Sequence, residues 1–195
     1  MAVFVARGLA TQVSAISFTG DISTSALSSF CQLIFYATLG ILILIRPHAK
    51  AQATSVLPKV AAFVGTYLPW SIIFTARTDY PGLALVSSAC VLIGMFMTLL
   101  TLRHLGRSFS LVPQARRVVQ TGPYRWIRHP LYLAEELAFL GVVLQHLSPM
   151  GLVVLAGHIA AQVCRIHYEE ELLRRTLPDY MNYAAARWRL VPYMW

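Results

Sequence analysis

The chain has 195 residues, of which 57% are hydrophobic and 12% are charged, and its formal net charge is +8. This composition excludes an ordinary soluble domain and is typical of a protein that crosses the membrane several times. The positive charge does not indicate nucleic-acid binding, because the basic residues lie in short loops between apolar runs, where they set the membrane topology.

The N-terminal half contains three apolar runs of roughly membrane-spanning length. Before them, residues 1–20 carry one charge, Arg7, which follows the apolar residues and therefore does not fit a signal peptide. We expect an interfacial helix there. The second run contains Pro69, which predicts a kink. The predicted spans are 26–45, 57–76 and 83–102.

The polar stretch 103–129 is the longest in the chain and is too long to be a mere connector. Its C-terminal part continues into the next apolar run, so that residues 120–132 have the sequence QTGPYRWIRHPLY. Gly122-Pro123 predicts a turn, and Pro130 predicts the first turn of a following helix. The concentration of aromatic rings and guanidinium groups suits either the headgroup layer of a bilayer or a binding site.

Two further apolar runs, 131–147 and 150–166, predict a helical hairpin. They are joined by Ser148-Pro149, which fits a helix cap followed by a first-turn proline. The hairpin brings the number of predicted spans to five.

Basic residues predict how these spans are oriented. With five spans, 14 of the 16 Lys and Arg residues fall on one side of the membrane, and the positive-inside rule then predicts an outside N-terminus and a cytoplasmic C-terminus. The predicted fold is an all-α integral membrane protein with about five transmembrane helices. We divide it into the N-terminal segment with the first three spans, 1–102, and a catalytic region with the cytoplasmic loop, the hairpin and the tail, 103–195.

Charged residues after the hairpin form a second group of candidates. Arg165 and Glu169 lie on one helical face if the fifth span continues as a helix, and the hairpin should bring Tyr132 close to Arg165. The alternative is an ordinary salt bridge at a helix end, accompanied by the solvated carboxylates of Glu170 and Glu171.

Other ionisable residues are expected to have structural roles. Glu135 and Glu136, near the start of the fourth span, should face Arg128 or the arginines of the tail. His158 should be a hydrogen-bonded core residue. The three cysteines show no CxxC spacing and the six histidines no HExxH pair, so we expect no metal site.

Several motifs occur in an order that resembles the isoprenylcysteine carboxyl methyltransferase family, including its small prokaryotic relatives. The resemblance covers residues 94–192. The motifs are Leu105-Gly106-Arg107, GPYR and RHPLY within 119–132, Arg165 followed by Glu169-Glu170 and Leu173, and the pair Tyr180 and Tyr183.

The resemblance implies that the loop, the start of the next helix and the tail enclose S-adenosylmethionine, and that a lipid-bearing substrate enters from the bilayer. Arg165 and Glu169 are similar to the family's catalytic substrate-site pair. The chain departs from the family pattern at Leu177-Pro178-Asp179, so that Glu170 could take the role assigned to Glu169. The residues similar to cofactor contacts are Gln114, Arg116, Arg117, Val118, Val119, Tyr124, His129, Pro130, Leu131 and Tyr132.

The predicted function is S-adenosylmethionine-dependent methyl transfer to a lipophilic acceptor at the membrane, with an isoprenylcysteine-like carboxylate as the favoured acceptor. Arg165 would hold the acceptor carboxylate and Glu169 would orient Arg165. The alternatives are N-methylation of a phospholipid or other lipid amine, an NADPH-dependent sterol-type reductase of related fold, and a non-enzymatic transporter or assembly factor. The expected partners are membrane lipids and a lipophilic or prenylated substrate.

Overall fold

The computed structural model describes most of the chain after the first predicted span. The described residues are 48–75, 78, 80–110 and 112–195, together with Ala37, Ile41, Leu44 and Ile45. The predicted interfacial helix and nearly all of the predicted span 26–45 lie outside the described residues.

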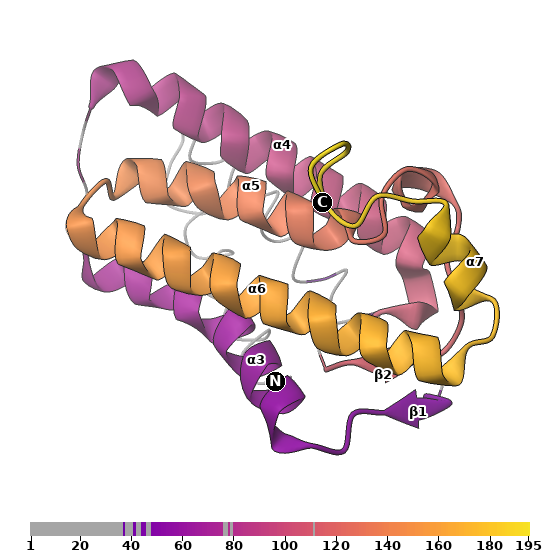
Figure 1. The fold of residues 1–195 in the computed structure, drawn as a ribbon. Coiled ribbons are helices and arrows are strands. Elements are labelled where there is room, and N and C mark those ends of the chain that lie inside the picture. Colours follow the sequence, from indigo (N-terminus) through magenta and orange to yellow (C-terminus); the bar gives the residue numbers. More distant parts are fainter. Residues whose placement is uncertain are drawn as a thin grey trace.

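The described part is mainly helical, and Figure 1 shows its four main helices side by side in the order α4, α5, α6 and α3. Short 3-10 segments connect or extend them, and two short strands pair antiparallel beside the polar loop. The helices are α3 (Val56–Tyr67), α4 (Pro81–Leu105), α5 (Pro130–Gln145), α6 (Pro149–Thr176) and α7 (Tyr180–Ala185). The 3-10 segments are η1 (Leu68–Phe74), η2 (Gly106–Ser108) and η3 (Gly122–Arg125), and the strands are β1 (Ala51–Gln52) and β2 (Gln114–Ala115).

Two of the described helical segments are long and apolar enough to cross a membrane. They are Gly82–Ser108, which comprises most of α4 with η2, and Pro149–Thr176, which is α6. The helix α5 has 16 residues and α3 has 12, which is shorter than the roughly 20 residues that a bilayer requires. The count of five spans therefore stays a prediction.

Prolines and caps set the helix boundaries much as predicted. The helix α3 gives way to the 3-10 segment η1 next to Pro69, because a proline has no N–H for the helical ladder. The backbone N–H of Gly151 donates a 3.0 Å hydrogen bond to Oγ of Ser148, and Pro149 opens α6, so the predicted cap is confirmed. The helix α6 continues through the charged segment to Thr176, beyond the predicted end of the apolar run.

The closest helix packing lies between α4 and α5, where two glycines allow the backbones to approach each other. A Cβ atom at Gly94 would lie 2.4 Å from the backbone nitrogen of Ala138, and one at Gly141 would lie 2.7 Å from the carbonyl oxygen of Ser87. The Ser87 hydroxyl also donates a 2.8 Å hydrogen bond to the Gly141 carbonyl. These contacts fix α5 against α4, and with it the start of α5 beside the polar loop.

The two ends of the helical layer are occupied by different segments. At one end, the Thr78 N–H donates to the Gln145 carbonyl, and the Leu147 N–H donates to the Thr78 hydroxyl, each at 2.9 Å. At the other end, the N–H of Arg128 donates to the Trp188 carbonyl at 2.8 Å. The loop and the C-terminal tail therefore lie together, as predicted.

Candidate active site

The loop before α5 has a conformation that its glycine and prolines dictate. Gly122 has a φ of +59°, and a Cβ atom there would lie 2.3 Å from the ring of His104. Pro123 follows in the first turn of η3, and Pro130 opens α5. The predicted turn and the predicted helix start are both confirmed.

The tail holds this loop in place through tyrosine side chains of α7. The buried Tyr183 hydroxyl donates a 2.9 Å hydrogen bond to the carbonyl of Tyr124. Tyr180 and Tyr183 also pack with Ala115 of β2 and Leu177 in one buried apolar cluster. The cluster therefore joins the strand pair, the end of α6 and the tail beneath the loop.

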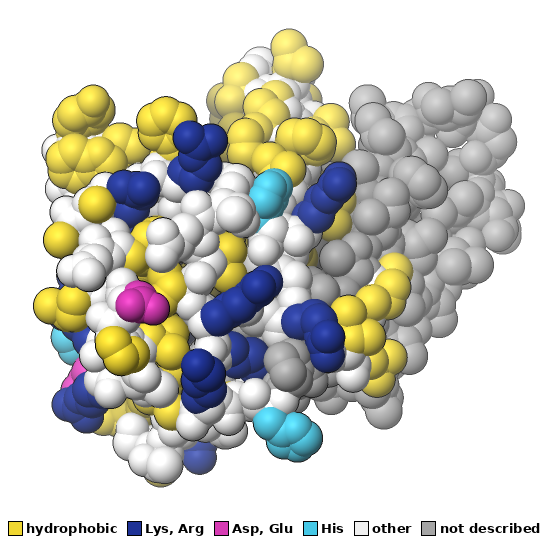
Figure 2. Space-filling model, turned by 90° about the vertical axis from the view of Figure 1, so that its right-hand side faces the viewer, with side chains coloured by type: hydrophobic (Ala, Val, Ile, Leu, Met, Phe, Trp, Pro, Cys, Tyr) yellow, Lys and Arg dark blue, Asp and Glu magenta, His cyan; other side chains and the backbone are white. Residues whose placement is uncertain are grey.

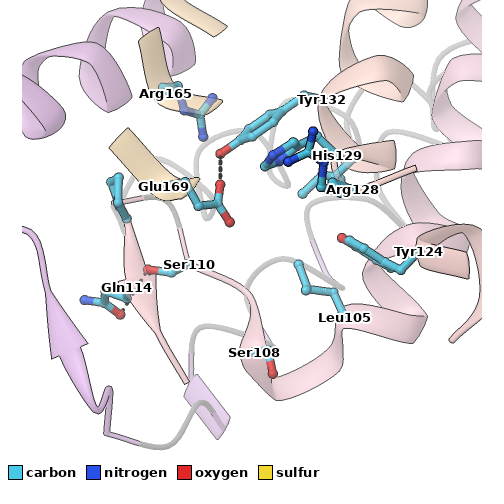
Figure 3. A pocket seen from close by; sticks show the side chains of 12 residues that line it. Leu105, Ser108, Ser110, Gln114, Tyr124, Arg128, His129, Tyr132, Arg165 and Glu169 are labelled. Atoms are coloured by element: carbon cyan, nitrogen blue, oxygen red, sulfur yellow. Dashed lines mark hydrogen bonds between the residues drawn. The ribbon is translucent and has the colours of Figure 1, made fainter. Parts of the chain in front are cut away.

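The predicted site residues line two adjoining pockets between the loop, β2, α5 and α6. Figure 3 shows the first pocket, which is lined by Leu105, Ser108, Ser110, Pro113, Gln114, Tyr124, Arg128, His129, Leu131, Tyr132, Arg165 and Glu169. The second shares much of this lining and adds Arg116, Arg117, Val118, Val119, Leu173, Tyr180 and Tyr183. Pro130 is the one predicted site residue outside both linings, and it is buried at the first position of α5.

Some lining residues were not among the predicted site residues. Arg128 belongs to the RHPLY motif, and Tyr180 and Tyr183 belong to the ordered motifs, so a sequence signal existed for these three. Ser108 and Ser110 carry no motif. They reach the pocket only because η2 and the following turn fold back toward α6.

In the first pocket, Tyr132 of α5 contacts both of the charged α6 residues that line it, Glu169 and Arg165. Its hydroxyl donates a 2.7 Å hydrogen bond to Oε2 of Glu169 (Figure 3). The Arg165 guanidinium lies over the Tyr132 ring, with its central carbon 4.8 Å from the ring centroid. The predicted proximity of Tyr132 and Arg165 is therefore confirmed.

Arg165 is itself buried, with 4% of its surface exposed. Its Nη1 donates a 2.8 Å hydrogen bond to Oε1 of Gln162 and lies 3.9 Å from Oε2 of Glu135. Its Nε has no hydrogen-bond partner among the described residues. This buried donor is available to a ligand.

Glu169 and Glu170 occupy different environments. Glu169 lines both pockets, whereas Glu170 lines neither of them and is 2% exposed. Oε1 of Glu170 lies 2.9 Å from Nη1 of Arg128 and 3.1 Å from Nε2 of His129, and Oε2 accepts from Arg174 at 2.8 Å. The structure thus places Glu169 at the pocket, and the alternative of a solvated Glu170 is wrong.

Glu135 lies 3.9 Å from Arg165, the first arginine of the tail, as expected, whereas Glu136 faces neither Arg128 nor a tail arginine, so that expectation is wrong for Glu136. Both turn toward α6, because α5 presents them to its hairpin partner. Gln162 donates a 2.8 Å hydrogen bond to Glu135, and Oε1 of Glu136 lies 2.9 Å from Nδ1 of His158. His158 is buried and its Nε2 lies 3.0 Å from the Gly65 carbonyl oxygen of α3, which confirms it as a hydrogen-bonded core residue.

The strand pair positions the polar wall of the pockets. Ser110 and Arg116 both donate to Oε1 of Gln114, at 3.0 and 2.6 Å, while the Gln114 amide donates to Gln52 of β1 at 3.1 Å. The Nε of Arg117 donates to the Ser108 hydroxyl at 3.1 Å. Arg116 and Arg117 therefore bring two guanidinium groups to the wall of the second pocket.

Tyr124 supplies a neutral aromatic face to both pockets. Burial raises the pKa of its phenol well above the ordinary value, and the nearby Glu169 carboxylate adds to the increase. The side chain therefore stays protonated at neutral pH and presents a ring and a hydroxyl, not an anion.

A comparison with known proteins identifies a family for the chain. A family model described as phospholipid methyltransferase matches residues 83–179, from the start of α4 to the residue before α7, and no curated protein matches the chain. The fold and the match define a membrane methyltransferase. The chain belongs to the family of membrane methyltransferases of the isoprenylcysteine carboxyl methyltransferase type. Members of this family normally use S-adenosylmethionine.

Proposed function

We propose that the protein transfers a methyl group from S-adenosylmethionine to the polar end of a lipophilic acceptor held in the membrane. The observation that carries this proposal is the convergence of two residue groups. The loop residues Tyr124 and His129 and the helix residue Glu169 line both pockets, and Arg165 lines the first. A donor in one pocket and an acceptor in the other would meet at this shared wall.

The residues present fit the methyl donor. S-adenosylmethionine combines a carboxylate, a positively charged sulfonium and an aromatic base. Arg116 and Arg117 offer guanidinium groups to a carboxylate. The rings of Tyr124 and Tyr132, with the carboxylate of Glu169, suit the positive sulfonium.

When bound, the sulfonium supplies an electrophilic methyl group, and its positive charge is lost as the methyl leaves. The protein's residues contribute by excluding water and fixing orientation. Tyr124, Tyr132 and Arg165 are all less than 10% exposed. Because transfer to an anion removes two opposite charges, a water-poor site stabilises the reactants less than bulk water does, which lowers the barrier.

The favoured acceptor is an isoprenylcysteine-like carboxylate. The buried Nε of Arg165, which has no hydrogen-bond partner among the described residues, can donate to such a carboxylate. Tyr132 contacts both Arg165 and Glu169, and it therefore fixes the positions of these two side chains relative to each other. A carboxylate oxygen would form the new bond to the methyl carbon, and the sulfonium would leave as a neutral thioether.

A second acceptor class is a lipid amine, and the position of Glu135 favours it. Its carboxylate lies 3.9 Å from Arg165 and already balances part of the guanidinium charge. A neutral amine could attack the methyl carbon, and Glu135 could receive the proton that the amine then releases. The description of the matching family as phospholipid methyltransferase agrees with this alternative.

Product chemistry separates the two acceptors. Purified protein is incubated with methyl-labelled S-adenosylmethionine and either an S-farnesylcysteine derivative or phosphatidylethanolamine, and the product is treated with base. A methyl ester releases labelled methanol, whereas an N-methyl group is stable. We expect a base-labile product from the carboxylate acceptor. Absence of transfer to both acceptors, together with no binding of S-adenosylhomocysteine, would refute the proposed function.

Single-residue variants test the role of each residue in methyl transfer and in cofactor binding. Arg165→Ala and Glu169→Ala should each lower turnover by about two to three orders of magnitude, because a charged contact in a water-poor site is worth roughly 2–5 kcal/mol. Their affinity for S-adenosylhomocysteine should stay near that of the unmodified protein. Glu135→Gln should abolish transfer only if the acceptor is an amine. Glu171→Gln, at an exposed ion pair with Arg175, is the matched control.

A further inference from the structure

A further polar hollow, separate from the two pockets, lies on the face of α6 that is turned away from them. It is lined by His167, Glu170, Glu171, Arg174, Arg175 and Arg189 and encloses about 300 Å³. Five of these residues follow the helical spacing of one α6 face, and Arg189 comes from the tail. We call this hollow the outer groove.

The charges of the outer groove are not balanced. Glu170 is almost fully buried and is already neutralised from within by Arg128, at 2.9 Å. Arg174 and Arg189 contact its other oxygen at 2.8 and 3.2 Å, and Arg175 pairs with Glu171. Four arginines therefore share two carboxylates, which leaves an excess positive charge on the groove.

The excess charge is accessible and has free donors. The side chains of Arg174 and Arg175 are 44% and 75% exposed. Nη2 of Arg174 donates to Glu170 and Nη2 of Arg175 donates to Glu171, whereas a guanidinium has five N–H donors in a planar fork. Such forks match the oxygens of a phosphate group bidentately.

The position of the groove indicates where the phosphate comes from. It lies on the last turns of α6, directly after the apolar part of a helix that is long enough to cross a membrane. Figure 2 shows that Lys and Arg side chains are spread over this end of the molecule and that few acidic side chains accompany them. A helix end of this kind lies at the depth of the lipid headgroups.

We propose that the outer groove binds the phosphate of an anionic phospholipid headgroup. This site is separate from the proposed methyl-transfer site, and its occupancy requires neither methyl donor nor acceptor. Exposed arginine–phosphate contacts are screened by salt, so binding should weaken as ionic strength rises.

The test compares lipids that differ only in headgroup. The affinity of the detergent-purified protein is measured for fluorescent phosphatidylglycerol and for phosphatidylcholine with the same acyl chains. Phosphatidylglycerol should bind more tightly, and the double variant Arg174→Gln/Arg175→Gln should weaken its binding at least about tenfold. The control Lys59→Gln/Arg103→Gln removes two exposed cations outside the groove and should leave the affinity unchanged.

A single variant and a competitor test the groove and the source of the phosphate separately. Arg175→Gln alone leaves every Glu170 contact intact, so it should fold normally and still weaken phosphatidylglycerol binding by about threefold or more. Inorganic phosphate is titrated as a competitor, and tight binding of free phosphate would overturn the lipid as the source. Equal affinity for the two lipids, or an equal loss in the Lys59→Gln/Arg103→Gln control, would overturn the site itself.

Discussion

The hydroxyl of Tyr132 donates a 2.7 Å hydrogen bond to Glu169 across the α5–α6 hairpin. The same ring lies under the guanidinium of Arg165. Tyr132 therefore links the loop side of the site, which we assign to the cofactor, to the α6 side, which we assign to the acceptor. The proposed chemistry therefore requires that the start of α5, which carries Tyr132, packs against the part of α6 that carries Arg165 and Glu169.

Removing only the hydroxyl of Tyr132 should separate orientation from packing. In Tyr132→Phe the ring stays over Arg165, but the Glu169 carboxylate loses a donor, and hydrogen bonds to charged groups contribute about 1.5–3 kcal/mol. Turnover should fall about tenfold to a hundredfold, while the Kd of S-adenosylhomocysteine changes little. Tyr132→Ala should weaken cofactor binding directly.

Turnover and cofactor affinity are measured in parallel on these variants. Tyr168→Phe, whose ring contacts His167, removes a tyrosine hydroxyl from α6 outside both pockets and serves as the control. Unchanged turnover of Tyr132→Phe would show that the bond to Glu169 does not orient the site.

Glu170 should stabilise the part of the molecule where the loop before α5, the end of α6 and the C-terminal tail meet. Glu170→Gln leaves the partly buried Arg128 and Arg189 without their counter-charge, and loss of one partner of a buried pair costs about 3–5 kcal/mol. We expect a lower free energy of unfolding and weaker cofactor binding, because Arg128 and His129 line the pockets.

Denaturant unfolding in mild detergent measures the effect. Glu171→Gln breaks an exposed pair with Arg175 one position along the helix and should change the free energy of unfolding by less than about 1 kcal/mol. Equal effects of the two variants would contradict the central role of Glu170.

The buried tyrosines of α7, Tyr180 and Tyr183, should make the protein sensitive to alkaline pH. Burial raises the pKa of Tyr183 to about 12 from its ordinary value of 10.0, and burial also raises the pKa of Tyr180. A raised tyrosine pKa means that the folded state favours the neutral phenol. The stabilisation is complete below about pH 10 and is lost as the pH rises toward about 12.

Thermal unfolding across this pH range provides the measurement. Tyr183→Phe should reduce the steepness of the alkaline loss, since its ring cannot ionise, although the variant also lacks the bond to the Tyr124 carbonyl. Tyr193→Phe, at a position that is 88% exposed, should keep the unmodified profile. An identical pH dependence in Tyr183→Phe would exclude this tyrosine as the source.

The sequence predicted those features that depend only on residues close together in the chain. Prolines and Ser148 marked the starts of α5 and α6, because a missing N–H and a cap act within a few residues. The hydrogen bond from Tyr183 to Tyr124 joins residues far apart in the chain, and no local rule specifies it. The choice between Glu169 and Glu170 depended on the rotation of α6 against the loop, which only tertiary packing fixes. The same holds for Glu135 and Glu136, which turn toward α6 and not toward Arg128.

Membrane orientation is the remaining prediction, and the two ends of the hairpin allow a direct test. Met150 lies at the closed end, near the contacts that involve Thr78, and is 61% exposed, whereas Tyr193 lies in the tail at the open end. We propose that the open end is cytoplasmic, because 14 of the 16 basic residues fall on that side if there are five spans.

In a background without Cys31, Cys90 and Cys164, a cysteine is introduced by Met150→Cys or by Tyr193→Cys and is treated with a membrane-impermeant reagent. In intact cells we expect labelling of position 150 only, and in inverted vesicles labelling of position 193 only. The physical reason is that moving this many guanidinium groups across the bilayer during insertion is costly, whereas the closed end carries few charges. Labelling of both positions from one side would contradict a membrane-spanning hairpin. The reverse pattern would contradict the orientation and place the proposed cofactor site outside the cell, where it would have no supply of S-adenosylmethionine.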